Sequence, residues 1–441
     1  MTTTLRLLLT RVLYFVLATS LIITVPSCEQ RSTKLQTGSV IFIHPDGTGA
    51  NTWNALRSIK VGPDGMLNWD KMDNMGLYRG HQRDVLGTSS NAGATTHAYG
   101  VKVKYADYGI HPDHPITSLS GKSKSIMHEA RDAGMSVAVI NSGHLNEPGT
   151  GVFLASAAKR SHNDEISNDI ILSGADIILG GGEKFLLPEG VVGLHGIGAR
   201  KDGKNLIELA KSEGYTIVYN KTELLALPST TEKVLGVFSY IHTFDDRTEE
   251  ILADDDNAPL YYPGTPTLAE MIQTTLRILK TRPEPFLLVV EEEGPDNFGN
   301  YLNASGVFES LGRADEGIGV VMKFIDNNPN TLLLTAADSD AGGLQIDFIK
   351  EKNYGKPLAL ETTSGAAIDG IEGTGSLPFT AKPDQYGKSF EFSVCWATSY
   401  DVYGGVIAKA HGLNSDLLPN NVDNTDIYRI MYATLFGEWL N

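Results

Sequence analysis

Residues 39–49, SVIFIHPDGTG, combine a short β-branched apolar run with a polar turn that contains glycine. The run has the length and composition of a buried strand, and NTWNALRSI at 51–59 has the apolar spacing of a helix. A buried strand that leads through a tight turn into a helix is typical of a parallel sheet. The stretch therefore predicts an α/β fold and places Asp46 at the carboxyl end of a strand.

The same alternation continues along the chain. Further strands are expected within 136–143, 175–182, 215–220, 233–240, 285–291 and 330–340, and helices within 125–134, 267–280, 304–326 and 424–440. This order predicts one domain over 38–441, with a largely parallel central sheet and helices on both faces. Residues 344–392 are rich in Gly, Lys, Pro and Thr, and we expect an insertion that passes over the site rather than a second core.

The N-terminus has the pattern of an export signal. Arg6 and Arg11 precede an apolar stretch at 13–24, and Ser27 and Cys28 follow it. Residues 1–28 therefore resemble a lipoprotein-type signal segment, followed by a short linker at 29–37. Cys28 would be the lipidated first residue of an exported protein, either periplasmic or attached to the outer membrane or cell surface. An ordinary signal peptide that happens to contain a cysteine is the alternative.

Composition restricts the partners. The chain has 36 Lys and Arg against 53 Asp and Glu, a formal net charge of −17. Clustered basic residues hold nucleic acid backbones, so nucleic acid is not the expected partner. Downstream of the signal no apolar run reaches about 20 residues, so the lipid at Cys28 is the one expected membrane attachment. The second cysteine, Cys395 in FSVCWA, is then unpaired and is expected to be a small core residue.

Several predicted strands end in polar turns: HPDG, NSGH, EEEGPD and AADSD. In open α/β sheets these ends meet at one edge, where ligands bind. The turn in EEEGPDNFGN at 291–300 is the most acidic, with four carboxylates within six residues. Such a turn is either a solvated surface feature or a set of ligands around a metal ion.

A helix is expected within 86–102, LGTSSNAGATTHAYGVK, where small residues dominate its first turn. Ser89 and Ser90 lie at its start. A hydroxyl in this position either caps the helix or faces an anion held by the free N–H groups and the positive end of the helix dipole.

Nine motifs occur in a fixed order along the chain: VIFIHPDGTG, SSNAGATTHAYGVK, ILGGGEKF, VLGVFSYIHTFDDR, TLAEMI, FLLVVEEEGPD, LGRADEGIG, TLLLTAADSDAGG and NTDIY. Together they resemble the alkaline phosphatase family over residues 38 to 436. The resemblance implies a metal-dependent hydrolase that acts on small phosphate monoesters through a phosphoserine. In that family two zinc ions and one magnesium ion usually organise the site.

The resemblance also implies roles for particular residues. Ser90 corresponds to the nucleophile, and Arg160 to the arginine that holds the phosphate oxygens. The implied metal ligands are Asp46, Glu291, Asp296 and Asp338, with Glu147 and Thr150 as candidates for the magnesium site.

The zinc-binding histidines are missing from the corresponding positions. Asn300 and Ser339 occupy two of them, and the third falls in CWATSYDVYGG at 395–405, which contains no histidine. The family aspartate before the nucleophile is Ser89 here. Carboxylate and amide oxygens suit hard cations, whereas zinc prefers nitrogen and sulfur. We therefore expect Mg²⁺, Ca²⁺ or Mn²⁺ rather than Zn²⁺, held by Asp46, Glu291, Asp296, Asn300 and Asp338.

Other readings remain open at this stage. His44, His97 and His144 lie in or beside site motifs and are either ligands or hydrogen-bonded structural residues. Glu292 and Glu293 are expected to belong to the turn or to support the ligands from behind. The same scaffold could hydrolyse phosphodiesters or sulfate esters. A catalytically inactive binding lipoprotein is the alternative outside enzymes, and the sequence does not determine the oligomeric state or the natural substrate.

Overall fold

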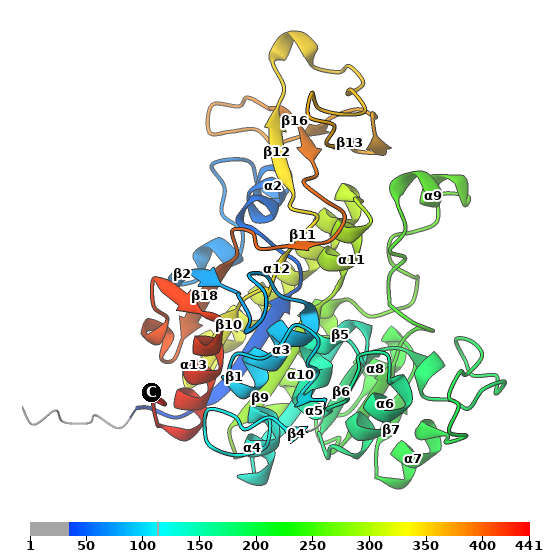
Figure 1. Ribbon diagram of the computed structural model, residues 1–441, viewed down its shortest axis with the longest axis vertical. Coiled ribbons are helices and arrows are strands. Elements are labelled where there is room, and N and C mark those ends of the chain that lie inside the picture. The colour runs from blue at the N-terminus through cyan, green and yellow to red at the C-terminus, as the bar shows by residue number, and fades with distance from the viewer. Residues whose placement is uncertain (1–34, 113) are drawn as a thin grey trace, which may run out of the picture. The chain divides into compact units, whose positions relative to one another are not determined.

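The computed structural model describes residues 35–112 and 114–441. The predicted signal segment 1–28, with Cys28, and residues 29–34 of the predicted linker lie outside these described residues. Within them the largest sheet has ten strands in the order β19-β2-β18-β10-β1-β9-β5-β6-β8-β7 (Figure 1). The strands from β10 to β7 in this order are all parallel, so the predicted α/β fold with a largely parallel central sheet is confirmed.

The bounds of these strands agree with the predicted runs. In spatial order the sheet contains β19 (Asn421–Asp423), β2 (Asn74–Arg79), β18 (Ile407–Gly412), β10 (Thr331–Thr335), β1 (Ser39–Pro45), β9 (Phe286–Glu292), β5 (Ser136–His144), β6 (Ile177–Gly181), β8 (Val234–Val237) and β7 (Thr216–Val218). Each strand of the parallel part coincides with an expected run to within a few residues. The antiparallel β18 and the neighbouring β2 and β19 were not predicted.

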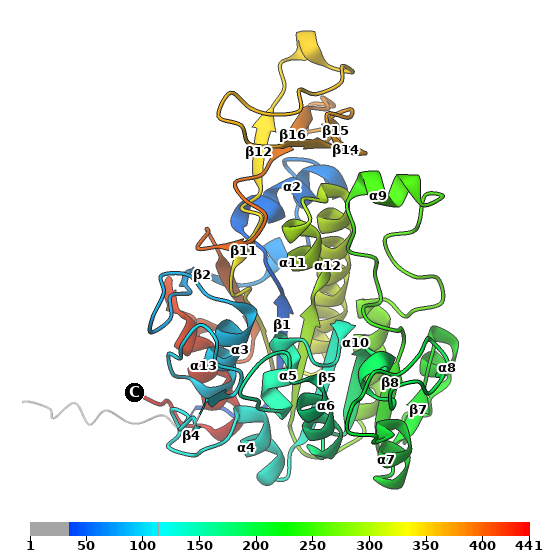
Figure 2. The same cartoon turned by 45° about the vertical axis from the view of Figure 1, so that its right-hand side comes forward.

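Helices cover both faces of the sheet because alternate strand residues point to opposite sides. Leu287 and Val289 of β9 belong to a core shared with α3 (Ser90–Tyr99), α5 (Pro148–Leu154) and α13 (Asn424–Phe436). Leu288 and Val290 belong to the opposite core, with α2 (Ala50–Lys60), α10 (Leu268–Leu279) and α12 (Ala304–Asn327). Figure 2 shows α3 and α12 on opposite sides of β1. Burying each such aliphatic side chain contributes about 1.5–3 kcal/mol.

Local signals set the ends of the predicted helices. Thr267 caps α10 by accepting a hydrogen bond from the Glu270 backbone, and the Glu270 side chain accepts one from the Thr267 backbone. Asn303 caps α12 through the backbone N–H of Gly306. The predicted helices within 267–280 and 304–326 begin at these caps.

The insertion within 344–392 has its own small sheet. Its strands are β12 (Gln345–Phe348), β13 (Ile368–Gly370), β14 (Gly373–Thr374), β15 (Phe379–Thr380) and β16 (Glu391–Cys395). Phe379 packs edge-on against Phe308 of α12 at 5.1 Å between ring centroids. The insertion therefore shares the core that lies beneath α12.

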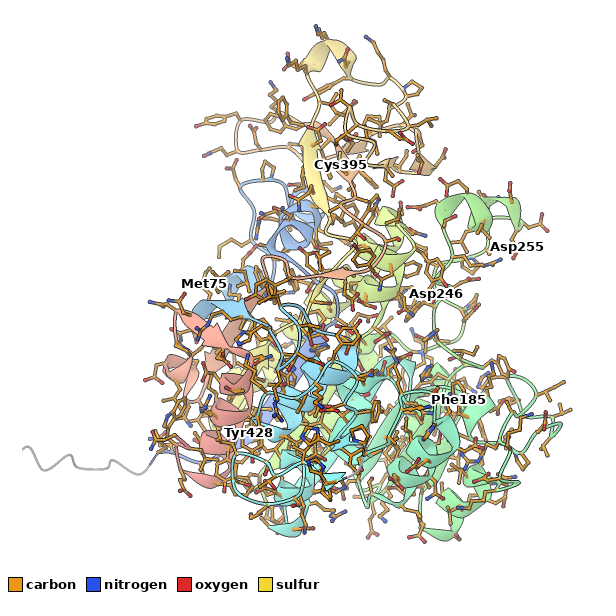
Figure 3. The ribbon with its side chains drawn as sticks, viewed as in Figure 1. Met75, Phe185, Asp246, Asp255, Cys395 and Tyr428 are labelled. Carbon is orange, nitrogen blue, oxygen red and sulfur yellow. The ribbon has the colours of Figure 1, made fainter. Side chains whose placement is uncertain are left out.

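Cys395 lies at the end of β16 in the insertion (Figure 3). It is partly exposed and is a free thiol, whereas its neighbour Val394 is fully buried. The expectation that Cys395 is a core residue is therefore wrong, because β16 leaves the core at its last residue. Among residues 35–112 and 114–441, no helix combines the length and the apolar character needed to cross a bilayer.

Candidate active site

The carboxyl ends of β1, β9 and β5 lie side by side at one edge of the central sheet. In the parallel register, His44 on β1 is paired with Glu291 on β9, and Glu291 is paired with Asn141 on β5. Asp46 follows β1 directly. Strand pairing thus aligns these side chains in one row outside the strand ends, where ligands bind in open α/β sheets.

Asp46 belongs to two groups of side chains that could each hold a cation. Ligand atoms of His44, Asp46 and Glu291 all lie within 4.8 Å of one another, and so do those of Asp46, Glu293 and Asp296. All five residues are buried. His44 Nε2 lies 3.0 Å from Oδ1 of Asp46. The sequence-predicted ligands Asp46, Glu291 and Asp296 are therefore brought together.

Asp338 follows β10 and belongs to the same assembly. It is buried, and after burial the charge of Asp46 is the strongest influence raising its pKa. The charge of Asp338 also raises the pKa of Asp296. We refer to Asp46, Glu291, Glu293, Asp296 and Asp338 together as the carboxylate cluster.

Every member of the carboxylate cluster has an oxygen without a hydrogen-bond partner among the described residues. These buried atoms are Asp46 Oδ2, Glu291 Oε1, both carboxylate oxygens of Glu293, Asp296 Oδ1 and both carboxylate oxygens of Asp338. A buried carboxylate without a partner is costly, and adjacent ones repel one another. The arrangement is stable with all groups ionised only when positive charge lies between them, so its chemistry fits divalent cations.

The pKa values of the cluster reflect this crowding. Burial, followed by the charge of Asp46, raises the pKa of Glu291 to about 8. Burial also raises the pKa of Asp46 to about 6. The pKa values of Glu293, Asp296 and Asp338 are raised well above their usual range, first by burial and then by neighbouring carboxylates. Without bound cations the cluster therefore holds protons at neutral pH.

Glycines allow other backbone segments to approach these carboxylates. A Cβ on Gly149 of α5 would lie 1.9 Å from Glu291 Oε1, and one on Gly93 of α3 would lie 2.4 Å from the Asp338 Cβ. Such separations are far below van der Waals contact. Helices α5 and α3 can therefore pack directly against the cluster only because these positions carry no side chain.

Helix α3 brings Ser90 to this edge, whereas Ser89 is occupied elsewhere. Ser89 is the N-cap: its hydroxyl accepts a hydrogen bond from the Ala92 N–H at 3.3 Å and donates one to the Tyr105 carbonyl at 2.5 Å. Ser90 is the first residue of α3 and is 4% exposed. Within the described part of the chain, its hydroxyl has no hydrogen-bond partner. Of the two serines, Ser90 is thus the one available for reaction.

Asn300 reaches the cluster together with a carboxylate that the sequence analysis missed. Its side-chain amide donates hydrogen bonds to Asp296 Oδ2 and Asp401 Oδ1, each at 3.1 Å. Asp401 lies on β17 (Asp401–Val402), which pairs with β11 (Asp340–Ala341) just after Asp338. This short ladder places Asp401 beside the carboxylate cluster, and its charge raises the pKa values of Asp296 and Asp46.

Glu292 and Glu293 differ from each other, although both were expected to belong to the turn. Glu292 accepts hydrogen bonds from Ser142 Oγ at 2.6 Å and the Tyr261 hydroxyl at 2.8 Å, and burial raises its pKa to about 7. Glu293 instead joins the carboxylate cluster. The sequence EEEGPD is not a solvated turn, because its four acids are buried. Helix α11 (Gly294–Asn300) begins immediately after the three glutamates, with Pro295 in its first turn.

Thr150 and Glu147 take different positions. The Thr150 hydroxyl donates to Glu291 Oε2 at 3.4 Å, so it borders the cluster. Glu147 is held by other partners: His144 Nε2 lies 2.8 Å from its Oε1, and Arg160 pairs with its Oε2. Burial alone would raise the pKa of Glu147, but His144 and Arg160 outweigh it and hold that pKa below its usual range.

Arg160 lies beside the cluster with 44% of its side chain exposed. The carboxylates of Glu147, Glu293 and Asp296 all raise its pKa, so the guanidinium stays charged. Of the histidines, His44 contacts Asp46, whereas His97 shares a 2.6 Å hydrogen bond with the Tyr78 hydroxyl inside the core. His97 is thus a buried structural residue.

Comparisons with known proteins identify the family. The alkaline phosphatase family profile matches residues 38–431. The tissue-nonspecific alkaline phosphatase of Rattus norvegicus is 26% identical over 68% of this chain and 62% of its own length. The alkaline phosphatase of Gadus morhua is 24% identical over 70% of each chain. The chain thus spans less than two thirds of the rat protein.

Solved structures show the same fold. The alkaline phosphatase of Thermus thermophilus superposes with a TM-score of 0.71 at 21% identity, covering 92% of this chain and 93% of that one. The alkaline phosphatase of the Antarctic bacterium TAB5 gives a TM-score of 0.68 at 19% identity, covering 91% and 100%. The resemblance found in the sequence is confirmed, and the chain belongs to the alkaline phosphatase family.

Proposed function

We propose that this protein hydrolyses phosphate monoesters through Ser90, using hard divalent cations held by the carboxylate cluster. The observation that carries the proposal is the buried set of unpartnered carboxylate oxygens packed against α3, at whose start Ser90 has a free hydroxyl. Serine at a helix start and clustered carboxylates at the sheet edge supply a nucleophile and cation ligands together.

The donor atoms favour hard cations. Asp46, Glu291, Glu293, Asp296 and Asp338 offer carboxylate oxygens, and Asn300, Asp401 and Thr150 add three more oxygen-bearing side chains at the border. Among the described residues, two groups of possible cation ligands contain Asp46, and His44 is the one nitrogen ligand in them. When bound, divalent cations supply positive charge that favours the serine alkoxide and neutralises phosphoryl oxygens.

Ser90 would carry the covalent step. Its hydroxyl proton passes to solvent as its oxygen forms a bond to phosphorus, the bond from phosphorus to the ester oxygen breaks, and the leaving alkoxide takes a proton from solvent. Water then attacks the phosphorus of the phosphoserine, the bond from phosphorus to the Ser90 oxygen breaks, and one proton of that water passes to the Ser90 oxygen as phosphate leaves. The free N–H groups in the first turn of α3 stabilise negative charge in both steps.

Arg160 would bind the nonbridging phosphate oxygens. Its ion pair with Glu147 occupies one side of the guanidinium, which has five N–H donors in all. The remaining donors can hold a phosphate in the planar, bidentate manner typical of arginine. Glu147 would then position Arg160 rather than bind the cations of the carboxylate cluster.

The proposed location follows from the N-terminus alone. Export, with a lipid anchor at Cys28, would place the enzyme in the periplasm or at the cell surface. Labelling cells with a radioactive fatty acid tests this, because Cys28→Ser should abolish incorporation into the protein.

Metal selectivity gives a direct test of the oxygen-rich site. Protein stripped with a chelator should recover p-nitrophenyl phosphate turnover with Mg²⁺ or Mn²⁺ at least about tenfold better than with Zn²⁺, because the ligands are almost all oxygen. Turnover restored by Zn²⁺ alone would contradict the hard-cation assignment but keep the hydrolase. No turnover with Zn²⁺, Mg²⁺, Mn²⁺ or Ca²⁺ would refute the proposed function.

Asp401 should tighten cation binding at the carboxylate cluster. Asp401→Asn keeps the side-chain shape but removes one negative charge beside Asp296, so the Kd for Mn²⁺ should rise about 10–100-fold. Titration calorimetry on metal-free protein measures this. Asp347→Asn is the matched control, since Asp347 lies exposed on β12 of the insertion. Equal affinities in wild type and Asp401→Asn would exclude Asp401 from the site.

A further inference from the structure

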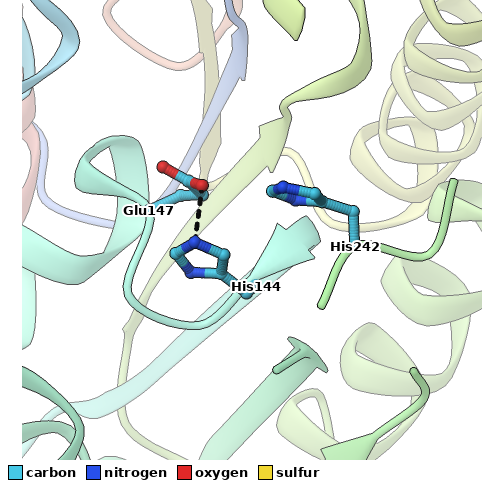
Figure 4. Close-up of side chains that lie close together, drawn as sticks. All are labelled: His144, Glu147 and His242. Atoms are coloured by element: carbon cyan, nitrogen blue, oxygen red, sulfur yellow. Dashed lines mark ion pairs between the residues drawn. The ribbon is translucent and has the colours of Figure 1, made fainter. Parts of the chain in front are cut away.

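His144, Glu147 and His242 form a second group of ligand-forming side chains (Figure 4). His144 ends β5, Glu147 precedes α5, and His242 lies in the segment after β8. One ligand atom from each lies within 4.8 Å of the other two. Three elements of the parallel sheet region thus direct two imidazoles and one carboxylate to one point.

His144 pairs with Glu147 through Nε2, whereas His242 has no hydrogen bond among the described residues that would explain its position. Among the described residues, Nδ1 of His144 and Nδ1 of His242 are buried without a partner. The His242 ring is held by stacking between His144 and Phe244, with ring centroids 5.1 Å apart in both pairs. No hydrogen bond to either nitrogen of His242 is formed within residues 35–112 and 114–441. Its nitrogens are therefore free to bind a ligand.

Glu147 retains an oxygen for such a ligand. Its Oε2 is taken by Arg160, whereas Oε1 faces His144 Nε2 at 2.8 Å. A cation bound by Oε1 and the imidazoles would leave the Arg160 pair intact.

We propose that His144, Glu147 and His242 bind one borderline transition-metal ion such as Zn²⁺, separately from the carboxylate cluster. Two imidazole nitrogens and one carboxylate oxygen are a donor set that zinc accepts, with a fourth position left for water. The hard cations of the carboxylate cluster compete poorly for imidazole. The site does not depend on the proposed hydrolase activity, since its ligands require no substrate.

The rival explanation is a structural one, in which His144 and Glu147 only hold Arg160. The two explanations differ at His242, which makes no hydrogen bond or ion pair to Arg160 or Glu147 in the structure. Replacing His242 should abolish metal binding in the first case and change nothing in the second. His242→Phe is the best variant, because a phenyl ring preserves the stacking and removes both nitrogens.

Cobalt titration provides the test. Full-length protein is stripped of metal, saturated with Mg²⁺ to fill the carboxylate cluster, and titrated with Co²⁺ while visible absorption is recorded. Wild type should show an intense d–d band of low-coordinate cobalt that reaches its plateau at one equivalent. His242→Phe should raise the Kd for Co²⁺ at least about tenfold and lose the band. His162→Ala, which removes an exposed histidine, is the control and should match wild type.

Two further readouts keep the result decisive. X-ray absorption at the cobalt edge of the wild type should report nitrogen neighbours, which requires no variant to fold. An identical band and affinity in wild type and His242→Phe, or a wild type without any intense band, would overturn the site. Phosphatase assays with Mg²⁺ alone judge the proposed function independently of either outcome.

Discussion

Ser90→Ala should lower phosphomonoester turnover on the order of 10³-fold or more. The hydroxyl of Ser90, the proposed nucleophile at the start of α3, makes no hydrogen bond within the described chain, whereas the neighbouring Ser89 hydroxyl is engaged as the N-cap. The variant removes one small, partnerless oxygen and should therefore fold normally. Steady-state kinetics measure the loss. Acid quenching with mass spectrometry should detect phosphoserine at residue 90 in wild type and none in Ser90→Ala.

Ser89→Ala is the matched control, because the adjacent hydroxyl has a structural task. It should lower the free energy of unfolding by about 1 kcal/mol, since the N-cap hydrogen bond to Ala92 is lost. Turnover per folded molecule should stay near that of wild type. The reverse pattern, with Ser89→Ala inactive and Ser90→Ala active, would transfer the nucleophile to Ser89. Full activity in both variants would remove serine from the mechanism.

Metal-free protein should become less stable as the pH rises from 5 to 8. In the folded state burial and mutual repulsion raise the pKa of Asp46 to about 6 and that of Glu291 to about 8. In the unfolded chain both groups ionise near pH 4. Between these limits the folded protein binds more protons than the unfolded one, so stability decreases with pH. Each unit of pKa difference corresponds to about 1.4 kcal/mol.

Saturating Mg²⁺ should reverse this loss. A cation that binds only the folded state at 1,000 times its Kd adds about 4 kcal/mol of stability. The gain should be greatest near pH 8, where ionised carboxylates are the ligands. Urea unfolding at a series of pH values, with and without Mg²⁺, measures both effects. A metal-free protein whose stability is constant or rises between pH 5 and 8 would contradict the raised pKa values of the cluster.

Other buried carboxyl groups also make stability decrease as the pH rises. A variant is therefore needed to measure the contribution of the carboxylate cluster alone. Burial also raises the pKa of Glu249 to about 9 and that of Asp369 to about 7, at the base of the insertion. Glu291→Gln should flatten part of the pH-dependent loss and weaken the Mg²⁺ effect. The exposed Glu213→Gln should leave both curves unchanged.

The parallel part of the fold was predictable from the sequence because its strands are buried on both faces. A run such as PFLLVV contains no polar residue, and β9 is buried throughout. Strand β2, which lies between β19 and β18, was missed for the opposite reason. Its burial alternates, and Met75 and Leu77 are exposed, so NMGLYR carries no continuous apolar signal.

The candidate site was only partly predictable. Asp46, Glu291, Asp296 and Asp338 follow strands or begin the next helix, so local pattern and family resemblance both pointed to them. Asp401 depends on the pairing of β17 with β11, a contact across the whole insertion that local spacing does not encode. In the sequence Asp401 lies within CWATSYDVYGG, the stretch that corresponds to the missing third zinc histidine. An acid in that stretch was the one signal that could have identified it as a ligand.

Glu293 and His242 could not be assigned from the sequence, because their roles depend on where their side chains point in the fold. Glu292 and Glu293 are adjacent acids, yet the start of α11 turns Glu293 into the cluster, whereas Glu292 is held by Ser142 and Tyr261. His242 reaches His144 only because β8 and β5 lie two strands apart at the same edge. No spacing of residues in the sequence predicts either contact.

The close contacts of Gly93 with Asp338 and of Gly149 with Glu291 have a consequence for how this lineage can vary. A Cβ at either position would collide with a buried carboxyl side chain, so a substitution there requires that acid to move, shorten or disappear. Each glycine and its acid should therefore tend to change together among relatives. These glycine–acid pairs can be used to find such relatives, whichever metal those proteins bind.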